Sequence, residues 1–302
     1  MSHSHHHHKI NYNKIFAIGV ALNFTYVIIE FIYGLSINSL ALIADAGHNL
    51  SDVFSLLLAW GANYLVNKAP TPKHTYGYKK SSILAAFFNS VILLVAMGAI
   101  ILESVKRFSE PHPIPGDVVM IVAGIGVVIN AISALLFFSG KDKDINLKGA
   151  FLHLAADAAV SLGVVAVGVI MSYSDVYWLD PAVSIIIAII IIYGTAGLFR
   201  DSLSLALDGV PSHIEDEKIK EYLNNLEEIE SYHDLHIWGM STTQTAMTLH
   251  VIVKEGIDTD KLISNISTKM DEEFNIHHST IQFEKNIDLN CRLNNNNKVN
   301  KG

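Results

Sequence analysis

Two histidine–aspartate pairs stand out because each lies within an otherwise apolar stretch of the chain. His48 and Asp52 belong to ADAGHNLSDV, residues 44–53, and His153 and Asp157 belong to FLHLAADAAV, residues 151–160. In a helix, residues four apart share one face, with their Cβ atoms about 5–6 Å apart. Two such helices facing each other would offer two imidazoles and two carboxylates, a ligand set that tetrahedral zinc accepts. The sequence therefore predicts a metal site built from both pairs.

The surroundings of these pairs indicate a membrane protein. Half of the 302 residues are hydrophobic, 17% are charged and the mean hydropathy is +0.34, whereas soluble domains contain about 25% charged residues. Six apolar blocks are long enough to cross a bilayer as helices, and the two pairs fall in the second and the fifth. The predicted fold class is therefore membrane α-helical, with spans at residues 15–35, 39–65, 82–105, 117–139, 147–173 and 178–203.

A membrane location makes a functional role for the paired residues more plausible than a packing role. An ionised aspartate costs about 2.5–3.5 kcal/mol at the centre of a membrane helix, and such residues usually mark a pathway. Two aspartates would neutralise a divalent cation, which lowers the cost of burying both the ion and its ligands. Imidazole ligands favour zinc over manganese and magnesium, and they leave cadmium, cobalt and nickel as alternatives.

The positive charges predict that both termini are cytoplasmic. Ten lysines and arginines flank the blocks on the side of the N-terminus, and two flank them on the other side. Membrane proteins keep the excess of such residues in their cytoplasmic loops. Short loops suit a bacterial inner membrane, with an organelle membrane as the alternative.

The C-terminal part of the chain differs from the rest in charge and in pattern. The net charge of −8 lies within residues 207–302, because acidic and basic residues balance in residues 1–206. An acidic surface suits cations and not the phosphates of nucleic acid. The hydrophobic periodicity predicts a small α-β-β-α-β domain with a hairpin and a third strand at 279–285. We expect a histidine-rich tail (1–11), a membrane domain (12–206), a linker (207–211), a cytoplasmic metal-binding domain (212–286) and a disordered asparagine-rich tail (287–302).

Two further features have open interpretations. Asp45 lies three residues before His48, on the same side of the helix. It could orient the imidazole through a hydrogen bond, contribute to a proton path, or serve helix packing. The N-terminal MSHSHHHHKI is either a purification remnant or a native metal-gathering tract. We favour the native tract because Ser4 interrupts its histidines, which are His3, His5, His6, His7 and His8.

The chain resembles the cation diffusion facilitator family, in particular its zinc-transporting branch, which includes bacterial zinc/cadmium efflux proteins and vertebrate zinc transporters. The resemblance rests on six spans, on H-x-x-x-D in spans two and five, and on SLALIADAGHNLSD, HDLHIWGMSTTQTAMTLHV and IHHSTIQFE. It covers about residues 12–291. It implies a homodimer that exchanges metal for protons and carries a metallochaperone-like cytoplasmic domain.

The resemblance also implies metal sites outside the membrane. One zinc ion would be bound in the cytoplasmic domain, and another site would lie near the membrane interface. The implied ligands are His233, His250 and Glu284 for the first site, and His74 and His277 for the second.

The residues alone leave one of these assignments open. His233 and His236 are three apart on a predicted strand, so they should face opposite sides of it, and only one could share a site with His250. The family match favours His233. At position 282, where some members have a further histidine, this chain has glutamine.

Together, these features predict a secondary transporter that exports Zn²⁺, with cadmium or cobalt as further substrates. Metal binding needs neutral imidazole and ionised carboxylate, so it releases protons, and an inward proton gradient could drive efflux. The alternative is a membrane-anchored metal sensor or buffer, which would need no buried site. An intramembrane metalloprotease would need a catalytic glutamate beside its ligands, as in H-E-x-x-H, and neither motif has one. The expected partners are divalent metal ions, protons, membrane lipid and a second copy of the chain.

Overall fold

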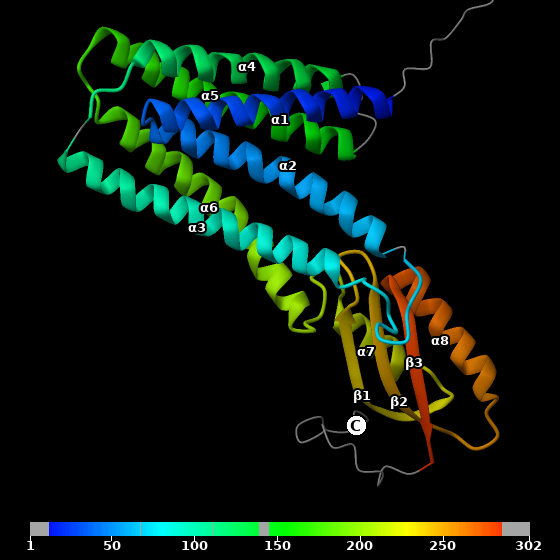
Figure 1. Cartoon of the computed structure of the whole chain (residues 1–302). Helices are drawn as coiled ribbons and strands as arrows, with labels where there is room; N and C mark the ends of the chain where they lie inside the picture. The colour runs from blue at the N-terminus through cyan, green and yellow to red at the C-terminus, as the bar shows by residue number, and fades with distance from the viewer. Residues whose placement is uncertain (1–11, 67, 111, 139–144, 286–302) are drawn as a thin grey trace, which may run out of the picture. The chain divides into compact units, whose positions relative to one another are not determined.

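The computed structural model describes residues 12–66, 68–110, 112–138 and 145–285, and it shows six long helices followed by an α/β domain (Figure 1). The helices begin and end within four residues of the predicted blocks. The prediction of six helices is therefore confirmed. They are α1 (Tyr12–Ser36), α2 (Leu40–Val66), α3 (Ser81–Ser109), α4 (Gly116–Phe138), α5 (Ile145–Tyr173) and α6 (Leu179–Ala206).

The outward surface of these helices suits lipid. Large aliphatic side chains such as Ile92, Leu102 and Leu135 are about two-thirds exposed, at 65–68%. A soluble protein rarely exposes contiguous apolar patches on this scale. Within the described residues, four stretches are long and apolar enough to cross a membrane: Ser81–Ser109, Gly116–Leu135, Phe151–Tyr173 and Leu179–Ala206.

The chain forms two compact units, which we describe separately. The first lies within residues 1–57 and 89–196, and it contains α1, α4, α5 and most of α2, α3 and α6. The second lies within residues 58–88 and 197–302, and it contains the α/β domain with the adjoining ends of α2, α3 and α6.

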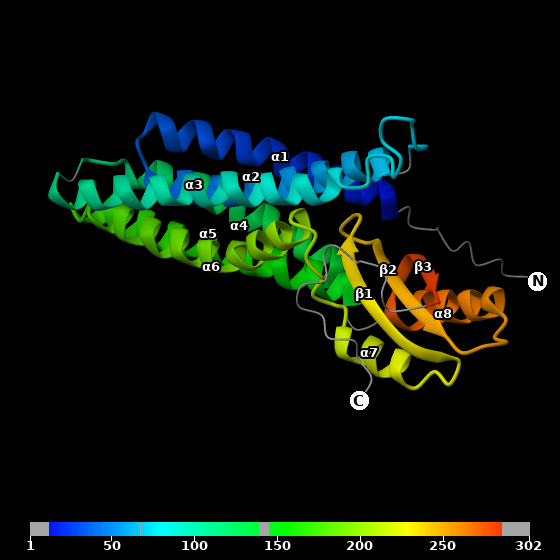
Figure 2. The ribbon, with the colours of Figure 1, turned by 90° about the horizontal axis from the view of Figure 1, so that it is seen from below.

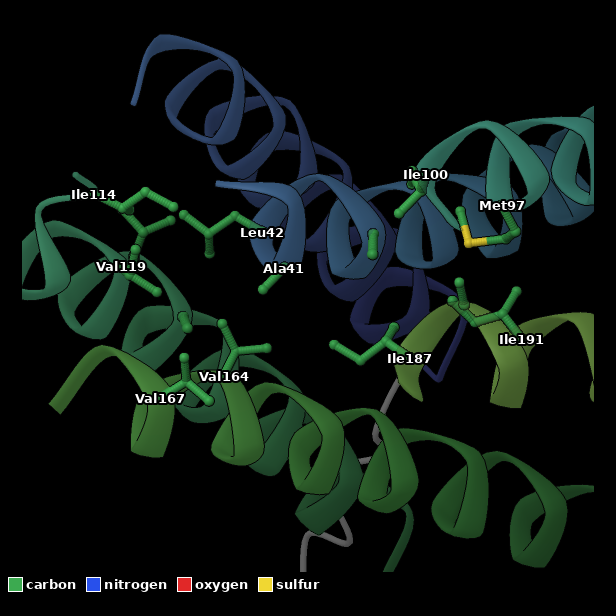
Figure 3. Close-up of a cluster of buried hydrophobic side chains, with 14 of the residues drawn as sticks. Ala41, Leu42, Met97, Ile100, Ile114, Val119, Val164, Val167, Ile187 and Ile191 are labelled. Carbon is green, nitrogen blue, oxygen red and sulfur yellow. The ribbon is translucent and has the colours of Figure 1, made fainter. Parts of the chain in front are cut away.

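An apolar core holds five helices of the first unit together. Leu42 of α2, Met97 of α3, Val119 of α4 and Val164 of α5 have no exposed surface, and Ile187 of α6 is only 4% exposed. Figure 3 shows these side chains pointing into the same space between the helices. Their burial fixes which faces of α2 and α5 are turned inward.

Two glycines bring the backbones of α4 and α5 into contact. A Cβ atom on Gly116 would lie 2.5 Å from the carbonyl oxygen of Gly168, and one on Gly168 would lie 2.6 Å from the amide nitrogen of Met120. Small residues permit such close approach between membrane helices. These glycines therefore position α5, the helix that carries His153 and Asp157.

A buried aspartate of α6 fixes the start of α2. Asp180 is fully buried, and its carboxylate accepts hydrogen bonds from Ser39 Oγ at 2.6 Å and from the Leu40 amide at 2.8 Å. Ser39 in turn caps the helix by accepting from the Leu42 amide at 3.3 Å. Amide groups at a helix start have no partner within the helix, so Asp180 satisfies them while anchoring the helix that carries His48 and Asp52.

The α/β domain of the second unit has the predicted α-β-β-α-β order. Strand β2 pairs antiparallel with β1 and parallel with β3, in the order β1-β2-β3. The third strand begins three residues earlier than predicted, because Ile276 already pairs with Thr245. The elements are α7 (Asp216–Asn224), β1 (Ile229–Gly239), β2 (Thr245–Val253), α8 (Thr259–Phe274) and β3 (Ile276–Glu284).

Both helices of this domain cover the same face of the sheet, as the second view shows (Figure 2). Leu223 of α7 and Ile266 of α8 share one apolar core with Leu249 and Val251 of β2. Side chains alternate between the two faces of a strand, so His250 lies on the face opposite the helices.

Candidate metal centres

The structure brings the two intramembrane pairs together within the first unit. His48 Nε2 lies 3.3 Å from Asp157 Oδ1 and 3.7 Å from Asp52 Oδ2. His153 Nε2 lies 3.4 Å from Asp52 Oδ2 and 3.6 Å from Asp157 Oδ2. Each imidazole nitrogen therefore faces both carboxylates, and each carboxylate faces both imidazoles. The cluster joins α2 to α5, as the sequence pattern predicts.

These separations match the spacing of ligands around a tetrahedral ion. Zinc binds nitrogen and oxygen ligands at about 2.0–2.2 Å, so the ligands at two corners of a tetrahedron lie about 3.3–3.6 Å apart. The four nitrogen-to-oxygen distances, from 3.3 to 3.7 Å, are close to this range. Ligand atoms of His48, Asp52 and Asp157 all lie within 4.8 Å of one another, whereas His153 lies outside this group and would have to move inward to complete a tetrahedral site.

The four side chains of this cluster differ in how far they are exposed at the surface of the first unit. The side chain of Asp157 is 5% exposed, whereas the side chains of His48 and Asp52 are 21% and 31% exposed and that of His153 is 49% exposed. The site is therefore closed behind Asp157 and open beside His153. An ion could enter and leave past this imidazole.

Among the described residues, Asp45 makes no hydrogen bond to the His48 imidazole. Its carboxylate oxygen Oδ2 accepts a hydrogen bond from Ser161 Oγ at 2.7 Å. Within the described part of the chain, His48 Nδ1 is buried without a hydrogen-bond partner.

A second cluster of possible ligands lies on the open face of the sheet. His233 Nε2 is 3.2 Å from Glu284 Oε2, and His250 Nδ1 is 3.0 Å from Glu284 Oε1. The side chains of Glu284 and His233 are only 2% and 6% exposed. A buried carboxylate needs a compensating charge, which a divalent ion would supply. The three residues come from three strands, so the sheet register holds the cluster together.

The prediction that His233 and His236 face opposite sides of β1 is wrong. His233 pairs with His250 and His236 pairs with Thr248, so β1 advances three residues while β2 advances two. This β-bulge shifts the alternation, as an extra residue in one strand does. Both histidines therefore lie on the open face, although only His233 reaches Glu284.

The bulge also introduces a residue that the sequence reading did not include. Asp234 has a left-handed backbone with φ of 53°. Its Oδ2 lies 3.6 Å from His250 Nε2, and its Oδ1 lies 2.9 Å from His236 Nε2. Strand alternation would turn Asp234 away from His233. The clue in the sequence was an aspartate directly after a predicted ligand, in HDLH.

The remaining predicted ligands are not brought into a cluster. His74 is exposed, and its ring contacts Tyr78 at 4.7 Å between centroids, whereas His277 Nδ1 accepts from the Thr245 amide at 3.5 Å. Among the described residues, neither belongs to a group of three metal-ligating side chains. The histidines of the N-terminal tract lie outside the described residues.

Comparisons with known proteins agree with both parts of the fold. The profile of the cation efflux transmembrane domain matches residues 16–205, and the profile of the cation efflux protein cytoplasmic domain matches residues 211–286. A solved structure described as the metal-bound C-terminal domain of the CzcD transporter from Cupriavidus metallidurans is 25% identical, covers 24% of this chain and 99% of that chain, and has a TM-score of 0.23.

Similar full-length proteins are named as metal transporters. A cadmium, cobalt and zinc/H(+)-K(+) antiporter from Bacillus velezensis is 33% identical, over 94% of this chain and 92% of the relative. The zinc transporter ZitB from Escherichia coli is 32% identical, over 94% of this chain and 93% of the relative. The family prediction is confirmed: the chain belongs to the cation efflux family of multi-pass membrane transporters.

Proposed function

We propose that this protein exports Zn²⁺ from the cytoplasm in exchange for protons, and that His48, Asp52, His153 and Asp157 bind the ion in transit. The proposal is carried by a cluster of two imidazoles and two carboxylates inside an apolar helical domain. Each imidazole Nε2 in this cluster lies 3.3–3.7 Å from an oxygen of both carboxylates. Relatives with names such as zinc transporter and zinc/H(+)-K(+) antiporter support zinc and proton exchange. Cadmium and cobalt are further substrates of the same ligand chemistry.

The exchange follows from competition between protons and metal for the same atoms. Zinc needs neutral imidazole nitrogens and ionised carboxylates. Each imidazole nitrogen faces two carboxylate oxygens, so in the absence of an ion a protonated imidazole can donate to them. Protons arriving from outside would therefore take over the contacts that the ion leaves, and the site would not be left with uncompensated carboxylates.

The cytoplasmic domain is proposed to bind a resident zinc ion. His233, His250 and Glu284 fit such an ion, because two imidazole nitrogens face the two oxygens of one buried carboxylate. Glu284 Oε2 and His233 Nδ1 are buried without hydrogen-bond partners among the described residues. A bound ion would supply positive charge to this face of the sheet and would hold its three strands together.

The proposed assembly is a homodimer in a bacterial inner membrane with both termini in the cytoplasm. The lysines and arginines that flank the helices support this orientation. The proposed membrane domain spans residues 12–206, followed by a linker at 207–211 and a cytoplasmic domain at 212–286.

Zinc flux into proteoliposomes tests the proposal. The purified full-length chain would be reconstituted with a zinc-sensitive dye inside, and external zinc would be added with and without an acidic lumen. We expect an acidic lumen to accelerate zinc entry. We expect Asp157→Ala to abolish it, because this residue faces both imidazoles.

Asp201→Asn is the matched control, since Asp201 is an exposed aspartate of α6 outside the cluster. Gradient-driven flux through Asp157→Ala at the wild-type rate would disprove the ligand assignment. Zinc binding by the wild-type protein without gradient-driven flux would instead support a metal sensor or buffer.

A further inference from the structure

Asp234 faces two imidazoles on the open face of the sheet. Its Oδ1 lies 2.9 Å from His236 Nε2, and its Oδ2 lies 3.6 Å from His250 Nε2. A carboxylate has only acceptor oxygens, so His236 donates to the first oxygen through its Nε2–H. The second oxygen remains for His250, which also belongs to the proposed zinc cluster. Among the described residues, that cluster consists of His233, His250 and Glu284 and does not include Asp234.

The two ring nitrogens of His250 face different carboxylates. Nδ1 lies 3.0 Å from Glu284 Oε1, whereas Nε2 lies 3.6 Å from Asp234 Oδ2. A neutral imidazole has one nitrogen that donates and one that accepts, and the nitrogen that binds a metal carries no proton. Because Nδ1 is the nitrogen turned toward the zinc cluster, the proton of a zinc-binding His250 is on Nε2. Asp234 is the acceptor in front of that proton.

This arrangement has a known effect on metal ligands. A ligating imidazole almost always donates its other N–H to a carboxylate, a carbonyl or water, which fixes the orientation of the ring and makes it a stronger ligand. The separation of 3.6 Å is slightly longer than a hydrogen bond, and a small rotation of either side chain closes it. The side chains of His250 and Asp234 are only 18% and 15% exposed, so water screens this contact weakly.

Charge balance at the cluster also favours a second carboxylate. Two neutral imidazoles and Glu284 supply one negative charge, which leaves one positive charge of a divalent ion uncompensated. The side chains of Glu284 and His233 are 2% and 6% exposed, and a buried charge needs a partner. Asp234 supplies the missing negative charge across the His250 ring without being a ligand itself.

The local structure of β1 holds Asp234 in this position. Its backbone has a φ of 53°, a left-handed conformation that aspartate and asparagine adopt more readily than other residues with a side chain. The β-bulge at His233–His236 brings it to the open face of the sheet. His236, whose side chain is 45% exposed, donates to its other oxygen from the solvent side. The carboxylate is therefore fixed from two directions.

We propose that Asp234 is a positioning residue of the cytoplasmic zinc site, which accepts the Nε2–H of His250 and so holds Nδ1 toward the ion. His236 acts one step further out, because it holds Asp234. The inference rests on the proposed resident zinc ion and extends that site beyond its three ligands.

Zinc affinity measured by equilibrium dialysis tests this role. The full-length protein would carry His153→Ala and Asp157→Ala, so that the intramembrane cluster does not contribute. Glycine is the truncation that suits a positive φ, and we expect Asp234→Gly to weaken zinc binding about 10–100-fold. Asp234→Asn keeps an acceptor oxygen but loses the charge, so it should weaken binding by a smaller factor. Asp271→Asn, at an exposed aspartate of α8, is the control and should bind as the parent protein does.

A second background separates a role through His250 from a role in shaping β1. In His250→Asn, the asparagine oxygen lies close to the position of Nδ1, and no atom takes the place of Nε2. Asp234→Gly should cause no further loss there, whereas a purely structural role predicts the same loss in both backgrounds. Where His250→Asn binds too weakly for this comparison, Asp234→Asn decides. It keeps the left-handed backbone and an acceptor for His236, so a structural role predicts unchanged affinity.

Parent-level zinc affinity in folded Asp234→Gly and Asp234→Asn would overturn the proposal, and so would an equal loss from Asp234→Gly in both backgrounds. Either result is distinguishable from failure of the proposed zinc site itself. In that case the parent protein would bind no zinc, or His250→Asn would bind it unchanged, whatever the Asp234 variants do.

Discussion

Asp157→Asn is the substitution that most sharply tests the intramembrane ligand set. Asp157 is the most buried of the four side chains, and it presents one oxygen to each imidazole, at 3.3 Å to His48 Nε2 and 3.6 Å to His153 Nε2. Asparagine has nearly the same shape but carries no charge and has only one oxygen to offer. The substitution therefore removes a charged ligand without opening a cavity.

The expected loss follows from the geometry. Replacing a residue that only orients a metal ligand typically lowers the metal affinity about 10–100-fold. Removing one member of a buried, hydrogen-bonded charge pair costs about 2–5 kcal/mol. For a ligand that faces both imidazoles we expect at least about 100-fold weaker zinc binding, or about 3 kcal/mol.

Isothermal titration of zinc into the purified protein would measure this change. The cytoplasmic ligands would be replaced in every sample, and Asp201→Asn would serve as the control, with wild-type affinity expected. An Asp157→Asn affinity within threefold of the wild type would refute the reasoning, because a neutral side chain would then serve as well as the carboxylate.

Three further predictions follow from other parts of the structure. Asp234→Asn should weaken zinc binding at the cytoplasmic cluster more than His236→Ala does. Asp234 Oδ2 lies 3.6 Å from Nε2 of the proposed ligand His250, whereas His236 contacts Asp234 and reaches the cluster only through it. Titration with the intramembrane ligands replaced would show this, and the reverse order would contradict it. Asp180→Ala should lower stability by about 1–3 kcal/mol, because buried donors at the start of α2 lose their acceptor; an unchanged Tm in detergent would count against it. Zinc affinity of the intramembrane site should fall as the pH is lowered, because imidazole binds metal only in its neutral form; a zinc affinity that does not change with pH would contradict the assignment of the two histidines as ligands.

The helices and the intramembrane cluster could be predicted from the sequence because both depend on local periodicity. A block of apolar residues fixes the length of a membrane helix, and a spacing of four fixes a shared face. The two H-x-x-x-D spacings therefore predict both halves of the site. The glycine contact at Gly116 and Gly168 required the structure, since sequence does not show which helices touch.

The bulge in β1 and the hydrogen-bond partner of Asp45 could not be predicted, for physical reasons. A β-bulge changes strand alternation without a strong sequence signature, so the faces of His233 and His236 were misassigned and Asp234 was missed. Asp45 accepts a hydrogen bond from Ser161 on another helix, and this contact depends on tertiary packing that the sequence does not show.

X-ray absorption spectroscopy of zinc bound to the protein tests the central claim most directly. The sample would be the full-length chain with His233→Ala, His250→Ala and Glu284→Gln, loaded with one zinc ion. The account predicts four nitrogen and oxygen ligands at about 2.0–2.2 Å, with the scattering pattern of two imidazoles. A six-coordinate, all-oxygen ion, or the same spectrum after Asp157→Ala and His153→Ala, would contradict it.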